Sequence, residues 1–163
     1  MVQSVNNHRQ NSGFTLIELL VVLAITAVLF GLIGINLGHP QTVASTTAST
    51  DTLLADLRSQ QLLAMIGGTG STASAQPHGL YLETSQYTLF AASSYNAGDS
   101  DNFVVQLSSG ARLTTTFPDA QIVFAKGTGE VENFVDGSNT ITIASSGVSR
   151  TITINRFGTP AVN

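Results

Sequence analysis

An apolar run of 22 residues with one carboxylate at its fifth position constrains this chain more than any other feature. Residues 14–35 read FTLIELLVVLAITAVLFGLIGI, and Glu18 is their only charged side chain. As a helix the run would span about 33 Å, enough to cross a bilayer core about 30 Å thick. A lone ionised group inside such a segment costs roughly a few kcal/mol, so Glu18 needs a positive partner.

The flanks of this run predict its orientation in a membrane. Arg9, His8 and the initial amine precede it, and no Lys or Arg follows as far as Thr50. Because positive residues stay on the cytoplasmic side, we expect a single pass through the cytoplasmic membrane with the bulk of the chain outside. A secretory signal peptide fits less well, since its apolar core has about 7–15 residues and its cleavage site follows that core.

At Gly13-Phe14-Thr15-Leu16-Ile17-Glu18-Leu19 the chain resembles the type IV pilin-like family, whose members share the pattern G-[FM]-T-L-I-E-L before a long apolar helix. The resemblance is strong over roughly residues 5–37 and extends to the rest only in architecture. It implies that residues 1–13 are a leader, that a prepilin peptidase cuts between Gly13 and Phe14, and that the amine of Phe14 is N-methylated. Other pilin or pseudopilin subunits, an assembly ATPase and an inner-membrane platform protein are the further partners it implies.

The physical chemistry of Glu18 agrees with that expectation. An amine on Phe14 would lie at the start of a helix, and it would attract a carboxylate strongly at low dielectric. Glu18 could pair with the amine of its own subunit, four residues away, or with that of a neighbouring subunit. The resemblance favours the second pairing, and a buried pair of this kind specifies register better than it adds stability.

Small residues punctuate the end of the expected transmembrane and filament-core helix, residues 14–37. Gly31 and Gly34 lie inside it, and Pro40 follows. Small residues allow close packing of helices in lipid. Glycine and proline also weaken a helix, so the same positions could melt or kink when a subunit leaves the bilayer. Both interpretations stand.

Residues 38–66 predict an amphipathic continuation of the helix, ended by Gly67-Gly68. Asp56 and Ser59 are expected on its polar side. The apolar arc expected to cover a sheet comprises Leu54, Leu57, Leu62 and Met65.

Beyond residue 67 the pattern changes to a period of two with Gly, Asn and Ser breaks, which predicts a β-rich head over 67–163. The fold class is therefore α+β, with one long N-terminal helix packed on an antiparallel sheet of about six to eight strands. The expected hairpins pair Gly79–Glu83 with Gln86–Ala91, Phe103–Leu107 with Arg112–Phe117, Gln121–Ala125 with Glu130–Phe134, and Thr140–Ala144 with Ser149–Asn155.

Within the family, the head is most similar to the H-type minor pseudopilins of type II secretion and related minor pilins. The similarity lies in the β-rich head and in a closing pattern that runs from Gln121 through Gly129 and Thr140 to Asn155-Arg156-Phe157-Gly158. Some relatives bind DNA through a Gly-Arg-x-Arg cluster. Here only Arg150 and Arg156 lie near that place, so nucleic-acid binding is not expected.

The composition offers little other chemistry. Net charge is −4, six Lys or Arg are present and cysteine is absent, which excludes disulfides and argues against a nucleic-acid footprint. No catalytic motif appears, so an enzyme is not expected, and neither is a cofactor. Asp99 and Asp101, beside Asn96, carry the oxygen ligands that calcium uses, but a solvated acidic loop is the favoured interpretation.

The sequence therefore predicts a minor pilin or pseudopilin that leaves the membrane for an extracellular pilus or a periplasmic pseudopilus. The alternative is a membrane-anchored extracytoplasmic binding module that does not polymerise. Such a module would have no need of Glu18.

Overall fold

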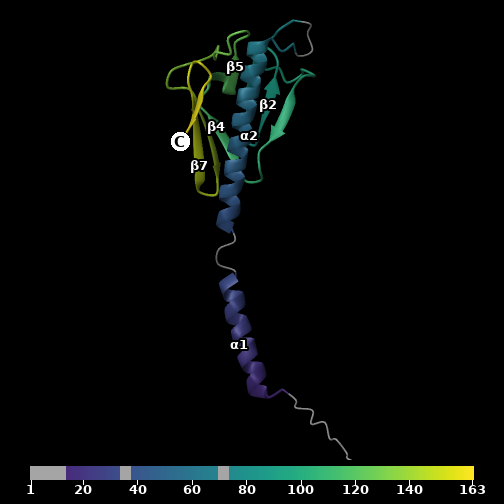
Figure 1. Ribbon diagram of the computed structural model, residues 1–163, viewed down its shortest axis with the longest axis vertical. Coiled ribbons are helices and arrows are strands. Elements are labelled where there is room, and N and C mark those ends of the chain that lie inside the picture. Colours follow the sequence, from purple (N-terminus) through teal and green to yellow (C-terminus); the bar gives the residue numbers. More distant parts are fainter. Residues whose placement is uncertain (1–13, 34–37, 70–73) are drawn as a thin grey trace, which may run out of the picture. The chain divides into compact units, whose positions relative to one another are not determined.

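The computed structural model describes residues 14–33, 38–69 and 74–163. It forms two compact units, Met1–Gly38 and His39–Asn163, which we describe separately. Helix α1 (Leu16–Ile33) belongs to the first. Helix α2 (Gly38–Ile66), apart from its first residue, and the eight strands of the described residues form the second, which we call the head (Figure 1). The expected leader, residues 1–13, lies outside the described residues.

Helix α1 contains the described part of the expected transmembrane segment. Its 18 residues end at Ile33, and the last part of the expected span, residues 34–37, lies outside the described residues. Within the described residues, none of the helices has both the length and the apolar character required to cross a membrane.

Helix α2 begins and ends at residues that favour those positions. Pro40 lies in its first turn, where the missing N–H would have no helical acceptor. At the other end Gly67 has a φ of +81°, and the N–H of Gly68 donates to the carbonyl of Leu63 at 2.7 Å. This is the left-handed cap that glycine supplies, so the predicted end of the helix is confirmed.

The face of α2 that packs on the sheets differs from the predicted arc. Leu57 is buried and Leu54 partly buried as expected, but Leu62 and Met65 are exposed. Over residues 44–66, whose burial the structure describes, seven positions are buried at mostly helical spacing. Four of the seven are polar, which is why apolar periodicity alone misplaced the face. They are Thr46, Ser49, Thr50, Leu53, Leu57, Gln60 and Ala64.

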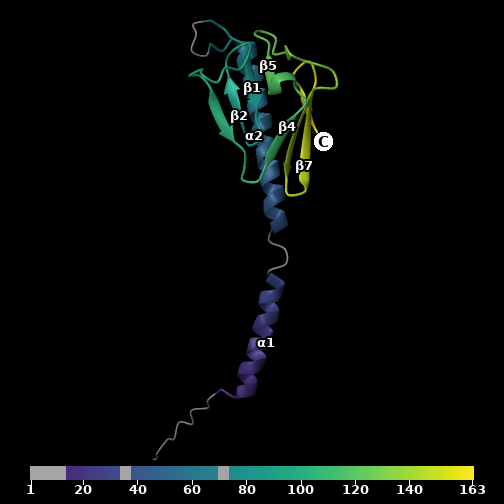
Figure 2. The ribbon, with the colours of Figure 1, turned by 180° about the vertical axis from the view of Figure 1, so that it is seen from behind.

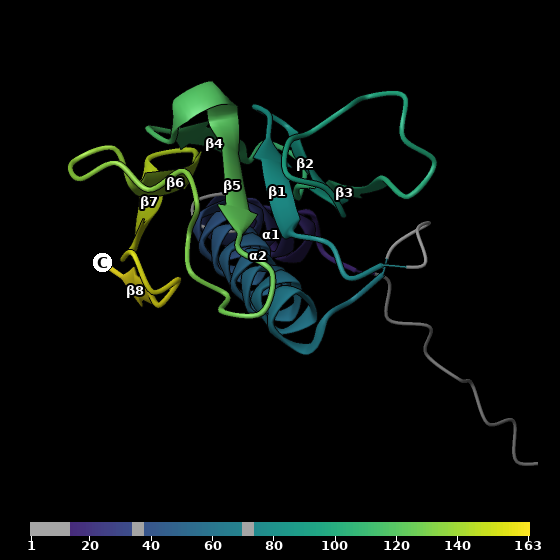
Figure 3. The same cartoon turned by 90° about the horizontal axis from the view of Figure 1, so that it is seen from above.

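Two antiparallel four-stranded sheets, rather than the single expected sheet, lie against α2. Helix α2 passes in front of them in Figure 1 and behind them in Figure 2. The first sheet has the order β3-β2-β1-β5 and the second β4-β6-β7-β8 (Figure 3). The strands are β1 (His78–Leu82), β2 (Gln86–Phe90), β3 (Phe103–Gln106), β4 (Arg112–Thr115), β5 (Gln121–Phe124), β6 (Thr140–Ser145), β7 (Val148–Ile154) and β8 (Pro160–Val162).

Two of the expected hairpins form and two do not. Strand β1 pairs with β2, and β6 pairs with β7, as predicted. Strand β3 instead pairs with β2, while β4 crosses to the second sheet and pairs with β6. The expected strand at Glu130–Phe134 is wrong, since it contributes only one bridge, from Val131 to Phe124. Strand β8 was not predicted, and its short Pro160–Val162 sequence offers little alternation to detect.

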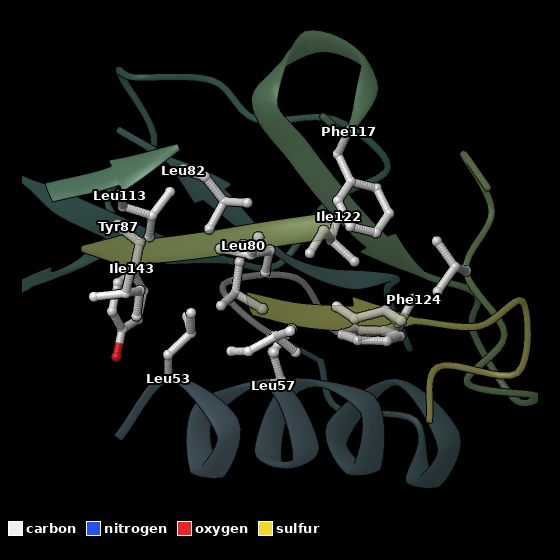
Figure 4. Close-up of a cluster of buried hydrophobic side chains, with 14 of the residues drawn as sticks. Leu53, Leu57, Leu80, Leu82, Tyr87, Leu113, Phe117, Ile122, Phe124 and Ile143 are labelled. Atoms are coloured by element: carbon white, nitrogen blue, oxygen red, sulfur yellow. The ribbon is translucent and has the colours of Figure 1, made fainter. Parts of the chain in front are cut away.

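The inner faces of both sheets and α2 enclose one apolar core (Figure 4). Strands β6 and β7 show the clearest alternation, because Ile141, Ile143, Ile152 and Ile154 are fully buried while their neighbours are not. Burying each such side chain contributes about 1.5–3 kcal/mol. From α2, Leu53 and Leu57 enter the same cluster.

Polar contacts fix α2 to the loops and strands around it. The hydroxyl of Tyr87 donates to Asp56 Oδ2 at 2.6 Å. Burial, and then the hydrogen bond to Asp56, raise the pKa of the Tyr87 phenol, so the neutral phenol is the donor. Further along the helix, Gln61 Nε2 donates to the carbonyls of Gly129 at 2.9 Å and Phe157 at 2.8 Å. One side chain thus ties the loops after β5 and β7 to α2.

Gly158 packs against the Gln61 side chain that ties these loops to α2. We therefore expect Gly158→Ala to destabilise the head more than Gly147→Ala. Both glycines have left-handed φ, +76° and +86°, which costs an alanine about 1–2 kcal/mol. A Cβ at Gly158 would also lie 2.4 Å from Gln61 Nε2, whereas one at Gly147 would meet nothing within 4 Å. Urea unfolding of the full chain in detergent should show roughly 1–3 kcal/mol of additional loss for Gly158→Ala. Equal losses would contradict this packing.

Candidate functional site in the N-terminal helix

Helix α1 begins with a capping interaction between Thr15 and Glu18. The N–H of Glu18 donates to Thr15 Oγ1 at 3.3 Å, and the N–H of Leu19 donates to the carbonyl of Thr15 at 3.2 Å. Thr-x-x-Glu is the spacing of a capping box. This role of Thr15 was not predicted above, although the spacing alone signals it.

The backbone N–H and the side-chain carboxylate of Glu18 have different roles. Its backbone N–H serves the helix start, where a negative charge is favourable because the macrodipole is positive there. Its carboxylate has no basic neighbour within α1, which contains no Lys, Arg or His. Phe14 lies before α1 begins. The four-residue spacing that puts two side chains on one helical face therefore does not apply to Phe14 and Glu18. A positive partner for the carboxylate must come from outside α1.

The surface of α1 is apolar in every direction. From residue 14 to residue 31 every side chain is exposed except Thr26, which is partly exposed. The exposed fraction is 82% at Phe14 and 70% at Phe30. The hydroxyl of Thr26 donates to the carbonyl of Val22 and so hides its polar group within the helix. A helix that is hydrophobic all round requires apolar cover from other molecules or segments.

The glycine and proline positions predicted to bend the helix are divided between the units. Gly31 lies inside α1, where an added Cβ would meet nothing within 4 Å, so no contact within the described chain requires glycine there. Gly34, like Gly13, lies outside the described residues. Pro40 is in α2, as described above. Their suggested role in melting stays a prediction.

The acidic loop of the head is held by its own hydrogen bonds. Asp99 Oδ1 accepts from the N–H of Asp101 at 3.0 Å, and Asn96 Oδ1 accepts from the N–H of Gly98 at 3.1 Å. Across residues 14–33, 38–69 and 74–163, no group of three or more His, Cys, Asp or Glu side chains could hold a metal ion. The structure thus joins Thr15 and Glu18 by a hydrogen bond at the start of α1, leaves Phe14 before that helix, and places Asp99 and Asp101 in the head.

Comparison with known families connects this segment to a processing motif. Residues 8–34 match the family model described as the prokaryotic N-terminal methylation motif. The match contains the Gly13–Phe14 junction and Glu18, and it supports the resemblance to the type IV pilin-like family, which is structural and not enzymatic. The motif implies processing by prepilin peptidase and assembly with other pilin subunits, and it suggests a membrane-anchored precursor. Neither the curated proteins nor the solved structures gave a match.

The capping geometry predicts a local effect of Thr15. Replacing Thr15 by valine removes the acceptor for the Glu18 N–H, and the loss of such a cap costs about 1 kcal/mol. Amide hydrogen exchange of the full chain in detergent should therefore accelerate about five-fold at Glu18. Thr15→Ser keeps the hydroxyl and should leave the rate unchanged. Exchange equally slow in Thr15→Val would show that the cap does not hold the helix start.

Proposed function

We propose that this protein is a minor pilin or pseudopilin, a structural subunit that is cut after Gly13, N-methylated on Phe14 and assembled into a type IV pilus or a type II secretion pseudopilus. The observation that carries the proposal is α1 itself. It presents apolar side chains on all sides and one carboxylate, Glu18, in its first turn. Such a surface suits a precursor anchored in a bilayer and then a filament core in which neighbouring helices replace the lipid.

In this proposal Glu18 selects the position of each new subunit. The cap occupies the backbone N–H of Glu18 and leaves its carboxylate for a partner outside α1. The methylated amine of a neighbouring subunit's first residue supplies the charge. Because an unpaired charge in an apolar core is costly, only the register that joins the two is tolerated.

The remaining parts of the proposal follow from this assembly. The precursor crosses the cytoplasmic membrane once with its head outside. Extraction into an extracellular pilus or a periplasmic pseudopilus then uses an assembly ATPase and an inner-membrane platform protein. The β-rich head faces outward from the filament. The β-rich head and the closing pattern from Gln121 to Gly158 are the grounds for proposing an H-type minor subunit.

Processing is the first step to test. Co-expression with a prepilin peptidase should yield a chain whose intact mass and N-terminal sequence begin at N-methylated Phe14, because the junction lies inside the matched motif. A chain expressed without the peptidase is the control and should keep Met1–Gly13. Retention of those residues beside a control pilin that is cut would overturn the proposal.

Assembly is the second step to test. Glu18→Ala should insert and be processed, yet it should enter sheared filaments poorly, because the register-selecting charge is gone. Thr26→Val is a matched control, since it also removes a polar group from α1, but one already satisfied by Val22. Immunoblots of the filament fraction against total processed subunit give the measurement. Wild-type incorporation of Glu18→Ala would show that Glu18 does not select the position of the subunit in the filament.

A further inference from the structure

Strand β3 forms one edge of the first sheet, where its neighbour is β2 (Figure 3). Its pairing extends one residue past the strand, because the N–H of Leu107 donates to the carbonyl of Ser85 at 3.0 Å. Backbone groups alternate in direction along an antiparallel strand. The N–H and C=O groups of Phe103, Val105 and Leu107 therefore face β2, and those of Val104 and Gln106 face away from the sheet.

The outward side of β3 is open within the part of the chain that the structure describes. No described segment hydrogen-bonds to the outward backbone groups of Val104 and Gln106. The neighbouring side chains are apolar and accessible, since Phe103 is 65% exposed and Val104 is 47% exposed. An edge that combines unpaired backbone groups with exposed apolar side chains is a template for pairing with another chain.

The opposite edge of the same sheet is closed by the chain itself. Strand β5 lies there, and the side chain of Asn133 takes the place of a further strand. Asn133 Oδ1 accepts from the N–H of Val123 at 3.2 Å, and its Nδ2 donates to the carbonyl of Gln121 at 2.7 Å. The N–H of Glu132 donates to the carbonyl of Val123 at 2.9 Å. The outward groups of β5 thus have partners.

The edges of the second sheet are also protected. On β4, the N–H of Leu113 donates to the carbonyl of Thr84 at 2.8 Å, and Arg112 adds a charge. Strand β8 has three residues and begins with Pro160, which has no N–H to offer. Short strands, charges and prolines are the usual protection of sheet edges. Strand β3, with the sequence FVVQ, has neither a charge nor a proline.

We propose that β3 pairs antiparallel with β3 of a second copy of this chain, about a two-fold axis at Val105. In this register Val104 of each copy lies opposite Gln106 of the other. Each of these two pairs exchanges two N–H···O bonds, so all four outward N–H and C=O positions of each strand are used. Val105 lies opposite its own equivalent, and Phe103 lies opposite Leu107. The edge is therefore complementary to itself.

The charges around β3 agree with an antiparallel pair. The chain has a net charge of −4, so two copies repel each other unless their acidic groups stay apart. Asp99 and Asp101 precede β3, and Arg112 follows it. Antiparallel pairing places the start of one β3 opposite the end of the other. The acidic residues of the two copies then lie at opposite ends of the pair, each toward the end that leads to Arg112.

The two-fold axis also determines how the heads are oriented. Phe103 lines a cavity of about 330 Å³ with Gln60 and His78, whereas Leu107 lines a smaller one with Ser49. Strand β3 thus runs opposite to α2, and the two copies of α2 run in opposite directions in the pair. Such a contact suits heads of separate assemblies. It is a property of the head and does not depend on the proposed processing or filament.

The pair is expected to be weak and reversible. Residues 103–107 supply five residues a side, well below the roughly 20–30 a side of a stable interface. The full chain in a non-ionic detergent should therefore change from monomer to dimer as its concentration rises, which sedimentation measures. A chain that stays monomeric at every concentration would overturn the proposal and leave this edge to an extended segment of another protein.

An introduced thiol reports the register, because the chain contains no cysteine. Opposite residues of a pair without hydrogen bonds have Cα atoms about 4.5 Å apart, within the range that a disulfide spans. Under mild oxidation, the full-length Val105→Cys variant should form disulfide-linked dimers at least about ten-fold faster than Ala161→Cys. Ala161 lies on the edge strand β8 and is the more exposed of the two, so random collisions would favour it. Equal rates, or a faster Ala161→Cys, would contradict the pairing.

A lysine on the outer face of β3 separates this contact from any association through α1. Adding Val104→Lys to Val105→Cys brings two lysines to diagonal positions about 7–8 Å apart, so cross-linking should slow about ten-fold. Val162→Lys changes a comparably exposed valine on β8 and should leave the rate unchanged. Both variants should unfold at the same urea concentration as their parent. No effect of Val104→Lys, or an equal effect of Val162→Lys, would show that β3 is not the contact.

Discussion

The head depends on α2, because this one helix covers the apolar faces of both sheets. Neither four-stranded sheet can bury its own apolar face, and the isoleucines of β6 and β7 need the same helix as the leucines of β1. Yet the covering face of α2 is half polar. Its polar residues are accommodated because the loops meet them, as when Ser49 Oγ and Ser108 Oγ hydrogen-bond at 3.0 Å. The helix therefore fixes the loops as well as the core.

The sequence predicted local structure well and long-range pairing poorly, for reasons visible in particular residues. Alternation in Thr140-Ile141-Thr142-Ile143 identifies β6 without reference to the rest of the chain. The partner of β4 is another matter, because the turn Ser108-Ser109-Gly110 is typical of a hairpin, while the chain uses it to cross between sheets. The face of α2 was misplaced for a similar reason. Thr46, Thr50 and Gln60 are buried by what they contact, and composition alone does not show this.

The N-terminal motif and the cavity of the head differ in how far the sequence could find them. Gly13, Phe14 and Glu18 lie in one short motif, so the sequence alone identifies them. The hydrogen bond by which Thr15 caps α1 was not predicted. The cavity at Gln60 and His78 joins residues from a helix, a strand and a loop, and neither residue stands out in its own segment. His78 matched no ligand spacing in the sequence. The fold buries it beside Gly68, and among the described residues its Nε2 has no hydrogen-bond partner.

Glu18 and Gln60 are both polar side chains, but they lie in different surroundings in separate units. Glu18 lies on an otherwise apolar helix and Gln60 on the half-polar buried face of α2, and neighbouring polar groups show that the chain can satisfy such residues internally. Thr26 bonds back to Val22, and Gln61, adjacent to Gln60, reaches two carbonyls. For an acceptor that other molecules can reach, a donor on another molecule is the simplest explanation. For Glu18 the donor that we propose is a neighbouring subunit's amine, whereas Gln60 Oε1 is closed off from solvent and is an unpaired atom that the described part of the fold itself contains.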